Sequence, residues 1–472
     1  MIPVRTRTNS DVAVFGLARS GCSAVRGLNA GGARVFAWDD NAAARDSAER
    51  EGARIAPFSE WPWASLKSLV LSPGVPLTHP APHPVVKAAR AAGVEVIGDL
   101  ELFGREIRRD PTVPGRAPVI AVTGTNGKST TTALIGHILA SCGFAPEVGG
   151  NIGKPALDLA APNGRTMYVL EVSSYQIDLS PDLVPDVSVL TNISPDHLDR
   201  HGTLENYVAV KSKLLEQTAH DGCVCIGVDD PQSASVYTRL AASGGATPVP
   251  VSVGKVLGRG IFAIDGALYD AQASRAAKIM DLSAAARLPG AHNWQNAALA
   301  YAATRPYVKD TRQIANAIAS FPGLAHRIED VGRVGNVRFV NDSKATNADA
   351  AAKALACYQD IFWILGGKPK DGGIESLAPY FPRIRKAFLI GEAAALFEQT
   401  LGDRVPHETS MTLERAVASA LSEARASSCT QPIVLLSPAC SSFDQFRDFE
   451  ARGDTFRSLV QEIAGLPVRE AS

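Results

Sequence analysis

Residues 118–132 combine a tight glycine turn with a lysine and a hydroxyl, the residue types of a phosphate-binding loop. A β-branched apolar run enters the turn from Gly124 to Gly127, and a helical stretch follows it. Backbone N–H groups of the turn would face an anion, Lys128 would add a point charge, and the Ser129 hydroxyl could hold Mg²⁺. The pattern predicts nucleotide phosphate binding. The alternative is an ordinary strand–turn–helix with an exposed lysine.

The loop departs from the standard P-loop pattern at one position. That pattern has a glycine five residues before Gly127, where this chain has Val122. The loop therefore belongs to a distinct subclass of phosphate loops or is not one.

Two apolar strands after the loop end in possible ligands for a hard metal ion. The strand at 168–170 leads to Glu171, and the strand at 187–190 leads to a polar segment that contains His197. If both strands lie beside the phosphate loop, these side chains converge on the γ-phosphate. Mg²⁺ prefers oxygen ligands, so His197 is the less usual donor. A capping or core role for His197 is the alternative.

A helical stretch at 203–218 places a lysine on its apolar face. Leu204, Tyr207 and Lys211 share that face, whereas Lys213 falls on the opposite, solvent side. Burying a bare ammonium is costly, so we expect Lys211 to be paired, chemically modified or extended along the surface to reach water. Periodicity alone does not choose among these.

The N-terminal region carries a variant of the dinucleotide-binding fingerprint. An apolar strand at 11–15 leads into a G-x-A-x-x-G turn, where Ala18 replaces the glycine that lets a pyrophosphate approach. A second strand ends in Asp39, the position of the ribose contact in such folds. The turn from Ser72 to Gly74 follows another strand, and we expect it to face the same binding crevice as the turn after the first strand. The region predicts either a site for a nucleotide-like ligand or a purely structural βαβ unit.

The C-terminal third of the chain contains four apolar strands followed by turns, and three of these turns are crowded with polar groups. In open parallel sheets, ligands bind outside the carboxyl ends of the strands. The segments at 341–347, 366–373 and 437–444 therefore predict a binding site.

These segments require a scaffold of alternating elements. Short apolar strands alternate with alanine-rich helical stretches, which indicates an α/β fold with mainly parallel sheets. At 472 residues the chain is too long for a single core, and Pro/Gly-rich breaks fall at 108–118 and near 321–323. We therefore expect three domains, at about 1–112, 113–322 and 323–472.

Charge and cysteine content narrow the class of protein. Lys and Arg number 47 and Asp and Glu 48, so no overall field favours nucleic acid or an anionic membrane. Cys223 and Cys225 alternate as strand residues do, and no second pair completes a zinc site. The N-terminus lacks an apolar signal segment, and no window approaches a membrane span. We expect a cytoplasmic protein with reduced thiols and neither a nucleic-acid partner nor membrane insertion.

Several segments together resemble the motifs of the Mur ligase family. The segment 123–130 looks like the family's ATP loop, which lacks the early glycine that Val122 replaces. Other matching segments follow in order at 171–176, 196–200, 207–211, 290–296 and 325–329. The resemblance runs from Gly16 to Phe449. It implies a central P-loop-type ATPase domain between an N-terminal and a C-terminal Rossmann-like domain.

The resemblance implies roles for individual residues. Lys128, His197 and Lys211 are similar to catalytic residues of the family, and Lys211 matches a lysine that the family carbamylates, which makes it an oxygen donor. The implied ligands of two Mg²⁺ sites are Ser129, Glu171, His197 and Lys211. The implied ATP contacts are Gly124, Thr125, Asn126, Gly127, Lys128, Ser129, Thr130, Asn293, Asn296, Arg327 and Asp342.

The resemblance also assigns substrate contacts. The family's diamino-acid-adding member carries an Asp-Asn-Pro-Arg motif that is absent here, and the C-terminal segments look like the D-glutamate-adding member. The implied D-glutamate contacts are Thr346, Lys370, Ser442 and Phe449, with Lys368 as a competitor of Lys370. The implied contacts of a UDP-linked substrate are Leu17, Arg19, Ser20, Asp39, Ser72, Gly74 and Asn151.

The implied activity is ATP-dependent addition of D-glutamate to UDP-N-acetylmuramoyl-L-alanine through an acyl phosphate, in cytoplasmic peptidoglycan precursor synthesis. The chain is expected to be a monomer whose third domain closes on the second. Rival hypotheses are a folylpolyglutamate synthase, a diamino-acid-adding Mur ligase, a non-catalytic ATP-binding partner subunit and, least favoured, a Rossmann oxidoreductase.

Overall fold

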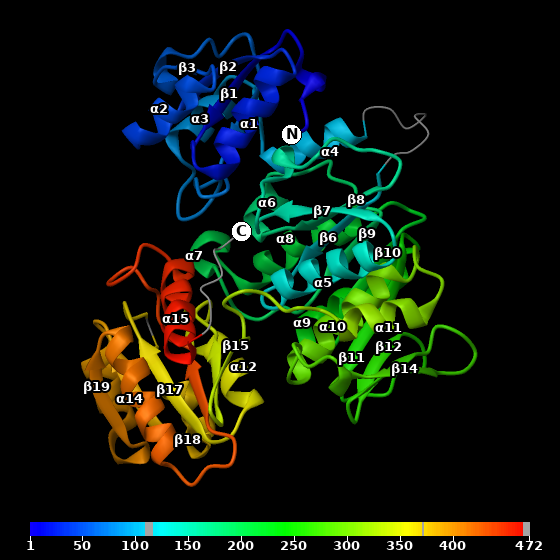
Figure 1. Ribbon diagram of the computed structural model, residues 1–472. Coiled ribbons are helices and arrows are strands. Elements are labelled where there is room, and N and C mark those ends of the chain that lie inside the picture. The colour runs from blue at the N-terminus through cyan, green and yellow to red at the C-terminus, as the bar shows by residue number, and fades with distance from the viewer. Residues whose placement is uncertain (109–116, 371, 466–472) are drawn as a thin grey trace. The chain divides into compact units, whose positions relative to one another are not determined.

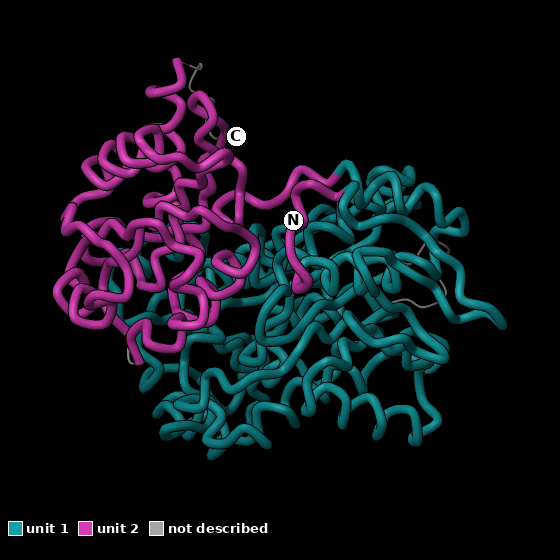
Figure 2. The backbone as a smooth tube through the Cα atoms, turned by 90° about the horizontal axis from the view of Figure 1, so that it is seen from below, with its two compact units in different colours: residues 1–284, 293–320 teal, residues 285–292, 321–472 magenta. Residues whose placement is uncertain are grey.

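The computed structural model describes residues 1–108, 117–370 and 372–465 (Figure 1). The chain forms two compact units: unit 1 holds residues 1–284 and 293–320, and unit 2 holds residues 285–292 and 321–472 (Figure 2). The described residues form an α/β protein with three mainly parallel sheets, two in unit 1 and one in unit 2. No helix in the described ranges is long and apolar enough to cross a membrane.

The predicted domain limits are not tested by this division and stay predictions. The predicted break at 108–118 lies almost wholly outside the described residues.

The first sheet of unit 1 has five parallel strands in the order β3-β2-β1-β4-β5. Because the chain turns to one side after β1 and returns on the other side as β4, the topological switch point lies between these two strands. Gly21 lets the first helix approach this edge, since a Cβ there would lie 1.9 Å from the Gly16 carbonyl oxygen. The elements are β1 (Asp11–Phe15), α1 (Arg19–Ala30), β2 (Arg34–Trp38), α2 (Ala42–Arg50), β3 (Arg54–Ile55), β4 (Leu66–Leu71), α3 (Pro84–Ala91), β5 (Glu95–Ile97) and α4 (Asp99–Ile107).

The second sheet of unit 1 has nine strands in the order β14-β13-β12-β11-β10-β9-β6-β8-β7. It is parallel except at β13 and β14. Since β9, β6 and β8 are neighbours, their carboxyl ends meet at one edge. The strands are β6 (Val119–Thr123), β7 (Ala145–Gly150), β8 (Thr166–Glu171), β9 (Val187–Leu190), β10 (Cys223–Gly227), β11 (Thr247–Val253), β12 (Ile261–Ile264), β13 (Ala267–Asp270) and β14 (Ala277–Asp281). The helices are α5 (Lys128–Ser141), α6 (Ser174–Asp178), α7 (Leu198–His201), α8 (Leu204–Glu216), α9 (Pro231–Ser243), α10 (Ala291–Thr304) and α11 (Thr311–Ala319).

A common apolar core joins the two sheets of unit 1. It contains Val14 and Leu28 from the first sheet layer and Leu157 and Tyr168 from the second, all buried. Phe103 of α4 packs edge to face against Tyr168, with ring centroids 5.0 Å apart. This shared core makes the two sheets one compact unit.

Unit 2 contains a six-stranded sheet in the order β15-β16-β20-β17-β18-β19, with only β15 antiparallel to its neighbour. The carboxyl ends of β16, β20 and β17 are adjacent at one edge. The elements are β15 (Glu329–Val334), β16 (Val337–Asn341), α12 (Ala348–Cys357), β17 (Ile361–Gly366), β18 (Ile384–Ile390), α13 (Ala394–Leu401), β19 (His407–Met411), α14 (Leu413–Ala426), β20 (Ile433–Leu436) and α15 (Phe449–Ala464).

Candidate active site

The glycine turn after β6 leads directly into α5, as the sequence predicts. Gly127 has a φ of 84°, and a Cβ there would lie 2.4 Å from Oδ1 of Asn296. Gly124 has a φ of 144°, and a Cβ there would lie 1.9 Å from Oγ1 of Thr191. Both positions therefore need glycine for conformation and for space. The start of α5, where N–H groups lack intrahelical acceptors, then favours an anion.

Lys128 folds back over this turn. Its Nζ donates hydrogen bonds to the carbonyl oxygens of Gly124 (2.9 Å) and Thr125 (2.8 Å). The turn is anchored to the end of β9, because the N–H of Asn126 donates to Oδ1 of Asn192 at 3.0 Å. Lys128 is thus part of the loop and not an extended surface lysine.

Two buried amides of α10 lie against the helix that the loop opens. Asn296 accepts a hydrogen bond from Oγ1 of Thr131 (3.2 Å) and donates to Oδ1 of Asn293 (3.1 Å). Ser129 is also buried at the start of α5, and Thr130 follows it in the first turn. The central ATP residues predicted from the sequence therefore lie together in unit 1.

Glu171 is the last residue of β8 and pairs in register with Val122 of β6. Its Oε1 accepts a hydrogen bond from Nδ2 of Asn151 at 2.8 Å. Its Oε2 is buried and has no hydrogen-bond partner in the part of the chain that the structure describes. A buried carboxylate oxygen without a donor is costly unless a cation neutralises it, so this atom fits a metal ligand.

His197 directly precedes α7 as its N-cap residue, with a left-handed φ of 53°. Its side chain makes no capping hydrogen bond and is 47% exposed, so the structure does not support a capping or core role. The Tyr175 hydroxyl lies 2.9 Å from Nδ1. Partial burial lowers the pKa of His197, and the positive charges of Lys128 and Lys211 lower it further. The imidazole is therefore neutral at pH 7, the form that can act as a ligand or base.

Lys211 is 1% exposed, so it does not reach water along the surface. Its Nζ donates to the Gly124 carbonyl oxygen at 2.9 Å, the same oxygen that accepts from Lys128. The Nζ also lies 4.6 Å from the Tyr207 ring centroid. Burial lowers the pKa of Lys211 well below its ordinary value, and Lys128 adds to the effect. Of the explanations that the sequence leaves open, pairing is not seen: its hydrogen bonds go to no carboxylate.

The four charged or ligating side chains thus gather at the carboxyl ends of β6, β8 and β9. Glu171 opposes the effect of Lys128 on the Lys211 pKa, which places all three charges within electrostatic reach. Among the residues that the structure describes, no group of three or more His, Cys, Asp and Glu side chains could hold a metal ion. A metal ion here would need further oxygen atoms, from a phosphate or from a modified Lys211.

The residues predicted for a UDP-linked substrate flank the switch point of the first sheet. The Leu17 N–H donates to Oδ2 of Asp39 at 2.5 Å, so this carboxylate orders the turn after β1. On the other side, the Ser72 N–H donates to the Phe15 carbonyl oxygen at 2.9 Å. The carbonyl oxygen of Gly74, in the same turn as Ser72, accepts a hydrogen bond from Arg200 of α7.

Arg19 and Ser20 open α1 beside the same crevice. The Arg19 guanidinium donates to the carbonyl oxygen of Gly153, two residues after Asn151. The crevice is therefore connected directly to the loop whose amide holds Glu171.

Asp342 of unit 2 is buried just after β16. Its Oδ2 accepts from Oγ of Ser437 (2.8 Å), and its Oδ1 accepts from the N–H of Ile328 (3.2 Å). Burial raises the pKa of Asp342 to about 7, against the opposing influence of Arg327. The two predicted ATP residues of unit 2 therefore lie within electrostatic reach of each other.

The predicted glutamate contacts lie on loops at one edge of the unit 2 sheet. They are Thr346 after β16, Lys370 after β17, Ser442 after β20 and Phe449 at the start of α15. The loops after β17 and β20 are joined, since the Lys368 N–H donates to the Ser441 carbonyl oxygen at 2.9 Å. Both Lys368 and Lys370 have exposed side chains, so the choice between them stays open.

Comparisons with known proteins bear on this arrangement. The family model described as Mur ligase middle domain matches residues 122–304, and the one described as Mur ligase, glutamate ligase domain, matches residues 326–440. The chain is 52% identical over 464 residues to UDP-N-acetylmuramoylalanine--D-glutamate ligase of Phenylobacterium zucineum, covering 98% of both chains. It is 51% identical over 471 residues to the protein of the same name from a Caulobacter species, covering 100% of both. The chain belongs to the Mur ligase family.

Solved Mur ligase structures share the fold. The UDP-N-acetylmuramate-alanine ligase MurC of Thermotoga maritima matches with a TM-score of 0.58 at 18% identity, covering 96% of this chain and 99% of that one. MurF of Acinetobacter baumannii matches with a TM-score of 0.57 at 18% identity, covering 81% and 88%. At this identity the likeness shows the fold alone.

Two arginines of this Mur ligase were not among the predicted site residues. Arg452 is buried in α15, and its guanidinium donates to the carbonyl oxygens of Ser343 (2.9 Å) and Cys440 (3.1 Å), on two loops of the predicted glutamate site. Burial lowers the pKa of Arg452 to about 10. Its place on one helix face with Phe456 and Val460 is the same periodic signal that singled out Lys211.

Arg200, the second of these arginines, donates to carbonyl oxygens of the turn at 73–75. Its acceptors are more than 120 residues away in sequence, so no local pattern could reveal them.

Proposed function

We propose that this protein joins D-glutamate to UDP-N-acetylmuramoyl-L-alanine in an ATP-dependent reaction of peptidoglycan precursor synthesis. The observation that carries the proposal is the 52% identity, over 98% of both chains, to a protein named for this reaction. The gathering of Lys128, Glu171, His197 and Lys211 around the glycine loop supports the ATP chemistry.

The predicted metal ligands divide between two Mg²⁺ positions. Ser129 would hold one ion beside the ATP phosphates, and Glu171 and His197 would hold the second. The buried Oε2 of Glu171, which has no hydrogen-bond partner among the described residues, supports this assignment. Such ions supply charge neutralisation for phosphate groups when bound.

Carbamylation of Lys211 would complete the second set of ligands. The lowered pKa of Lys211 favours the neutral amine, which is the form that adds to carbon dioxide. The product is a carboxylate-like oxygen donor with the loss of one proton. The carbamate carries a negative charge, so it would attract the Lys128 ammonium, which lies at the same Gly124 carbonyl oxygen.

The reaction proceeds by carboxylate activation. The alanyl carboxylate attacks the γ-phosphate of ATP, which gives an acyl phosphate and ADP. The amine of D-glutamate then adds to the acyl carbon, and phosphate leaves from the tetrahedral intermediate. Lys128 and the start of α5 stabilise the negative charge that develops on the phosphate oxygens. His197, whose pKa is lowered by burial, would orient or deprotonate the incoming amine.

The edge of the unit 2 sheet binds the amino acid. Lys370 and the hydroxyl groups of Thr346 and Ser442 suit the two carboxylates of glutamate, since a cation and hydroxyl donors form charge-assisted hydrogen bonds with them. Arg452 holds two of the loops that present these groups.

An amino-acid-dependent phosphate assay tests the function. Phosphate should be released only when ATP, UDP-N-acetylmuramoyl-L-alanine and D-glutamate are present together. Release with meso-diaminopimelate in place of D-glutamate would reassign the chain to the diamino-acid-adding reaction. Release with a pteroate substrate would indicate the folylpolyglutamate synthase alternative, and ATP binding without any turnover would indicate a non-catalytic subunit.

A further inference from the structure

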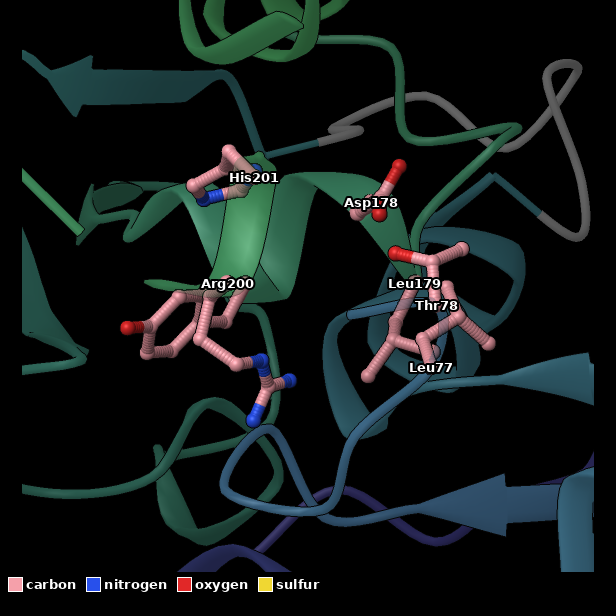
Figure 3. A pocket seen from close by; sticks show the side chains of 7 residues that line it. Leu77, Thr78, Asp178, Leu179, Arg200 and His201 are labelled. Carbon is pink, nitrogen blue, oxygen red and sulfur yellow. The ribbon is translucent and has the colours of Figure 1, made fainter. Parts of the chain in front are cut away.

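One arginine of the second sheet layer holds the turn that follows β4 in the first sheet. Arg200 Nη1 donates to the Gly74 carbonyl oxygen at 2.9 Å, and Nη2 donates to those of Pro73 (3.2 Å) and Val75 (3.0 Å). Figure 3 shows the Arg200 side chain extending from its helix toward the segment that carries Leu77. Only a guanidinium offers this fork of donors, so a lysine could not satisfy three carbonyls in the same way.

The other side of Arg200 is tied to His197. Its backbone N–H donates to the His197 carbonyl oxygen at 3.0 Å. Its guanidinium carbon lies 4.6 Å from the centroid of the Tyr175 ring, and the Tyr175 hydroxyl lies 2.9 Å from Nδ1 of His197. A shift of Arg200 would therefore disturb the imidazole through both the backbone and the ring.

The turn that Arg200 holds is one wall of the switch-point crevice. It packs closely against the end of β1: a Cβ on Gly16 would lie 2.5 Å from Cβ of Ser72, and the Ser72 N–H donates to the Phe15 carbonyl oxygen at 2.9 Å. The opposite side of the crevice is linked to the second sheet layer by Arg19 and the Gly153 carbonyl oxygen. One arginine on each side thus spans the two sheet layers of unit 1.

We propose that Arg200 is a positioning residue that sets the spacing between the site for the nucleotide end of the substrate and the site for its reacting carboxylate. The inference rests on the proposed function, in which one long substrate occupies both. A ligand that occupies both sites binds more tightly than one that occupies a single site only if the spacing of the sites matches its length. Loss of the Arg200 contacts should therefore lower affinity for the long substrate more than affinity for UDP.

Binding of two ligands to Arg200→Met tests this. Methionine keeps apolar contact with the Tyr175 ring and removes the donors to the turn. By titration calorimetry without ATP, we expect affinity for UDP-N-acetylmuramoyl-L-alanine to fall at least tenfold and affinity for UDP to stay within twofold. Arg200→Lys can reach one carbonyl, so its affinity for UDP-N-acetylmuramoyl-L-alanine should lie between those of Arg200→Met and the wild type. In turnover, KM for the UDP substrate should rise at least tenfold while KM for ATP stays within twofold.

Arg90→Met is the matched control, since Arg90 of α3 makes one long hydrogen bond of 3.5 Å to the Leu77 carbonyl oxygen near the same turn. It should bind both ligands as the wild type does. If Arg200→Met loses affinity for UDP and for the long substrate equally, or loses affinity for neither, the inference is wrong although the proposed function stands. If the wild-type chain does not bind UDP-N-acetylmuramoyl-L-alanine, the proposed function fails and the inference fails with it.

Discussion

Two lysines share one carbonyl acceptor at the centre of the site. Lys128 and Lys211 both donate to the Gly124 oxygen, and Lys211 is fully buried. Burial lowers the pKa of Lys211, and the positive charge of Lys128 lowers it further, so the neutral amine is favoured at Lys211. The burial of Lys211 was predictable from helical periodicity, but its acceptor was not, because the two residues lie 87 positions apart.

Replacing Lys211 with alanine should lower kcat by about 100-fold or more, since an oxygen ligand of the second metal ion is lost. Added formate or acetate should restore part of the rate by supplying an oxygen donor in the cavity. Lys213→Ala is the control, because Lys213 on the same helix is half exposed and pairs with Asp178. It should keep activity within about twofold, as a surface ion pair contributes little. Absence of rescue, with no carbamate carbon signal after labelling with ¹³C-bicarbonate, would contradict the carbamate.

The raised pKa of Asp342 makes the stability of the chain depend on pH. The folded chain binds this proton up to about pH 7, whereas the unfolded chain releases it near pH 3.8. The resulting stabilisation is complete below pH 3.8 and is lost as the pH rises through 7. Asp342→Asn stays neutral throughout. Its stability relative to the wild type should therefore rise by about 3 kcal/mol between pH 5 and pH 8. Urea unfolding at both pH values measures this, and a constant difference would show that the carboxyl titrates normally.

At the scale of elements, the start of α5 depends on a glycine that no other residue can replace. Gly127 and Gly143 flank the same helix, with φ values of 84° and 87°. A Cβ on Gly127 would meet Oδ1 of Asn296 at 2.4 Å, whereas nothing lies within 4 Å of a Cβ on Gly143. Alanine at Gly143 would therefore cause backbone strain alone, whereas alanine at Gly127 would cause the same strain and a steric clash with Asn296.

Gly127→Ala should lower ATP affinity at least 100-fold, because the added methyl group displaces Asn296 and the loop with it. Gly143→Ala should show only the strain of a left-handed alanine, about 1 kcal/mol of stability, with unchanged ATP affinity. Calorimetric titration with ATP and thermal unfolding of both variants measure the two effects. Equal ATP affinity in the two variants would contradict the role of the loop.

The helices and strands were more predictable from the sequence than the contacts between distant segments. The strands that end in Glu171 and in the segment before His197 follow from apolar runs, and their convergence follows from the parallel sheet. Contacts that cross between sheet layers were not predictable. The three carbonyl bonds of Arg200 and the link from Arg19 to Gly153 depend on how distant segments pack, which single-sequence periodicity does not encode.

At the scale of the whole molecule, the alternation of strands and helices predicted an α/β fold with mainly parallel sheets, and the structure and the Mur ligase neighbours confirm it. The three predicted domain limits stay predictions. The resemblance to Mur ligases is confirmed by relatives that match nearly the full length of the chain at 50–52% identity.

In the proposed reaction, the chain activates the alanyl carboxylate of the UDP substrate by phosphorylation and transfers the acyl group to D-glutamate. Isotope transfer tests this most directly, with both carboxylate oxygens of UDP-N-acetylmuramoyl-L-alanine labelled with ¹⁸O. We predict that one ¹⁸O leaves in the released phosphate and that the other stays in the carbonyl of the new amide bond to D-glutamate. Phosphate without ¹⁸O, or no amide product with D-glutamate, would contradict it.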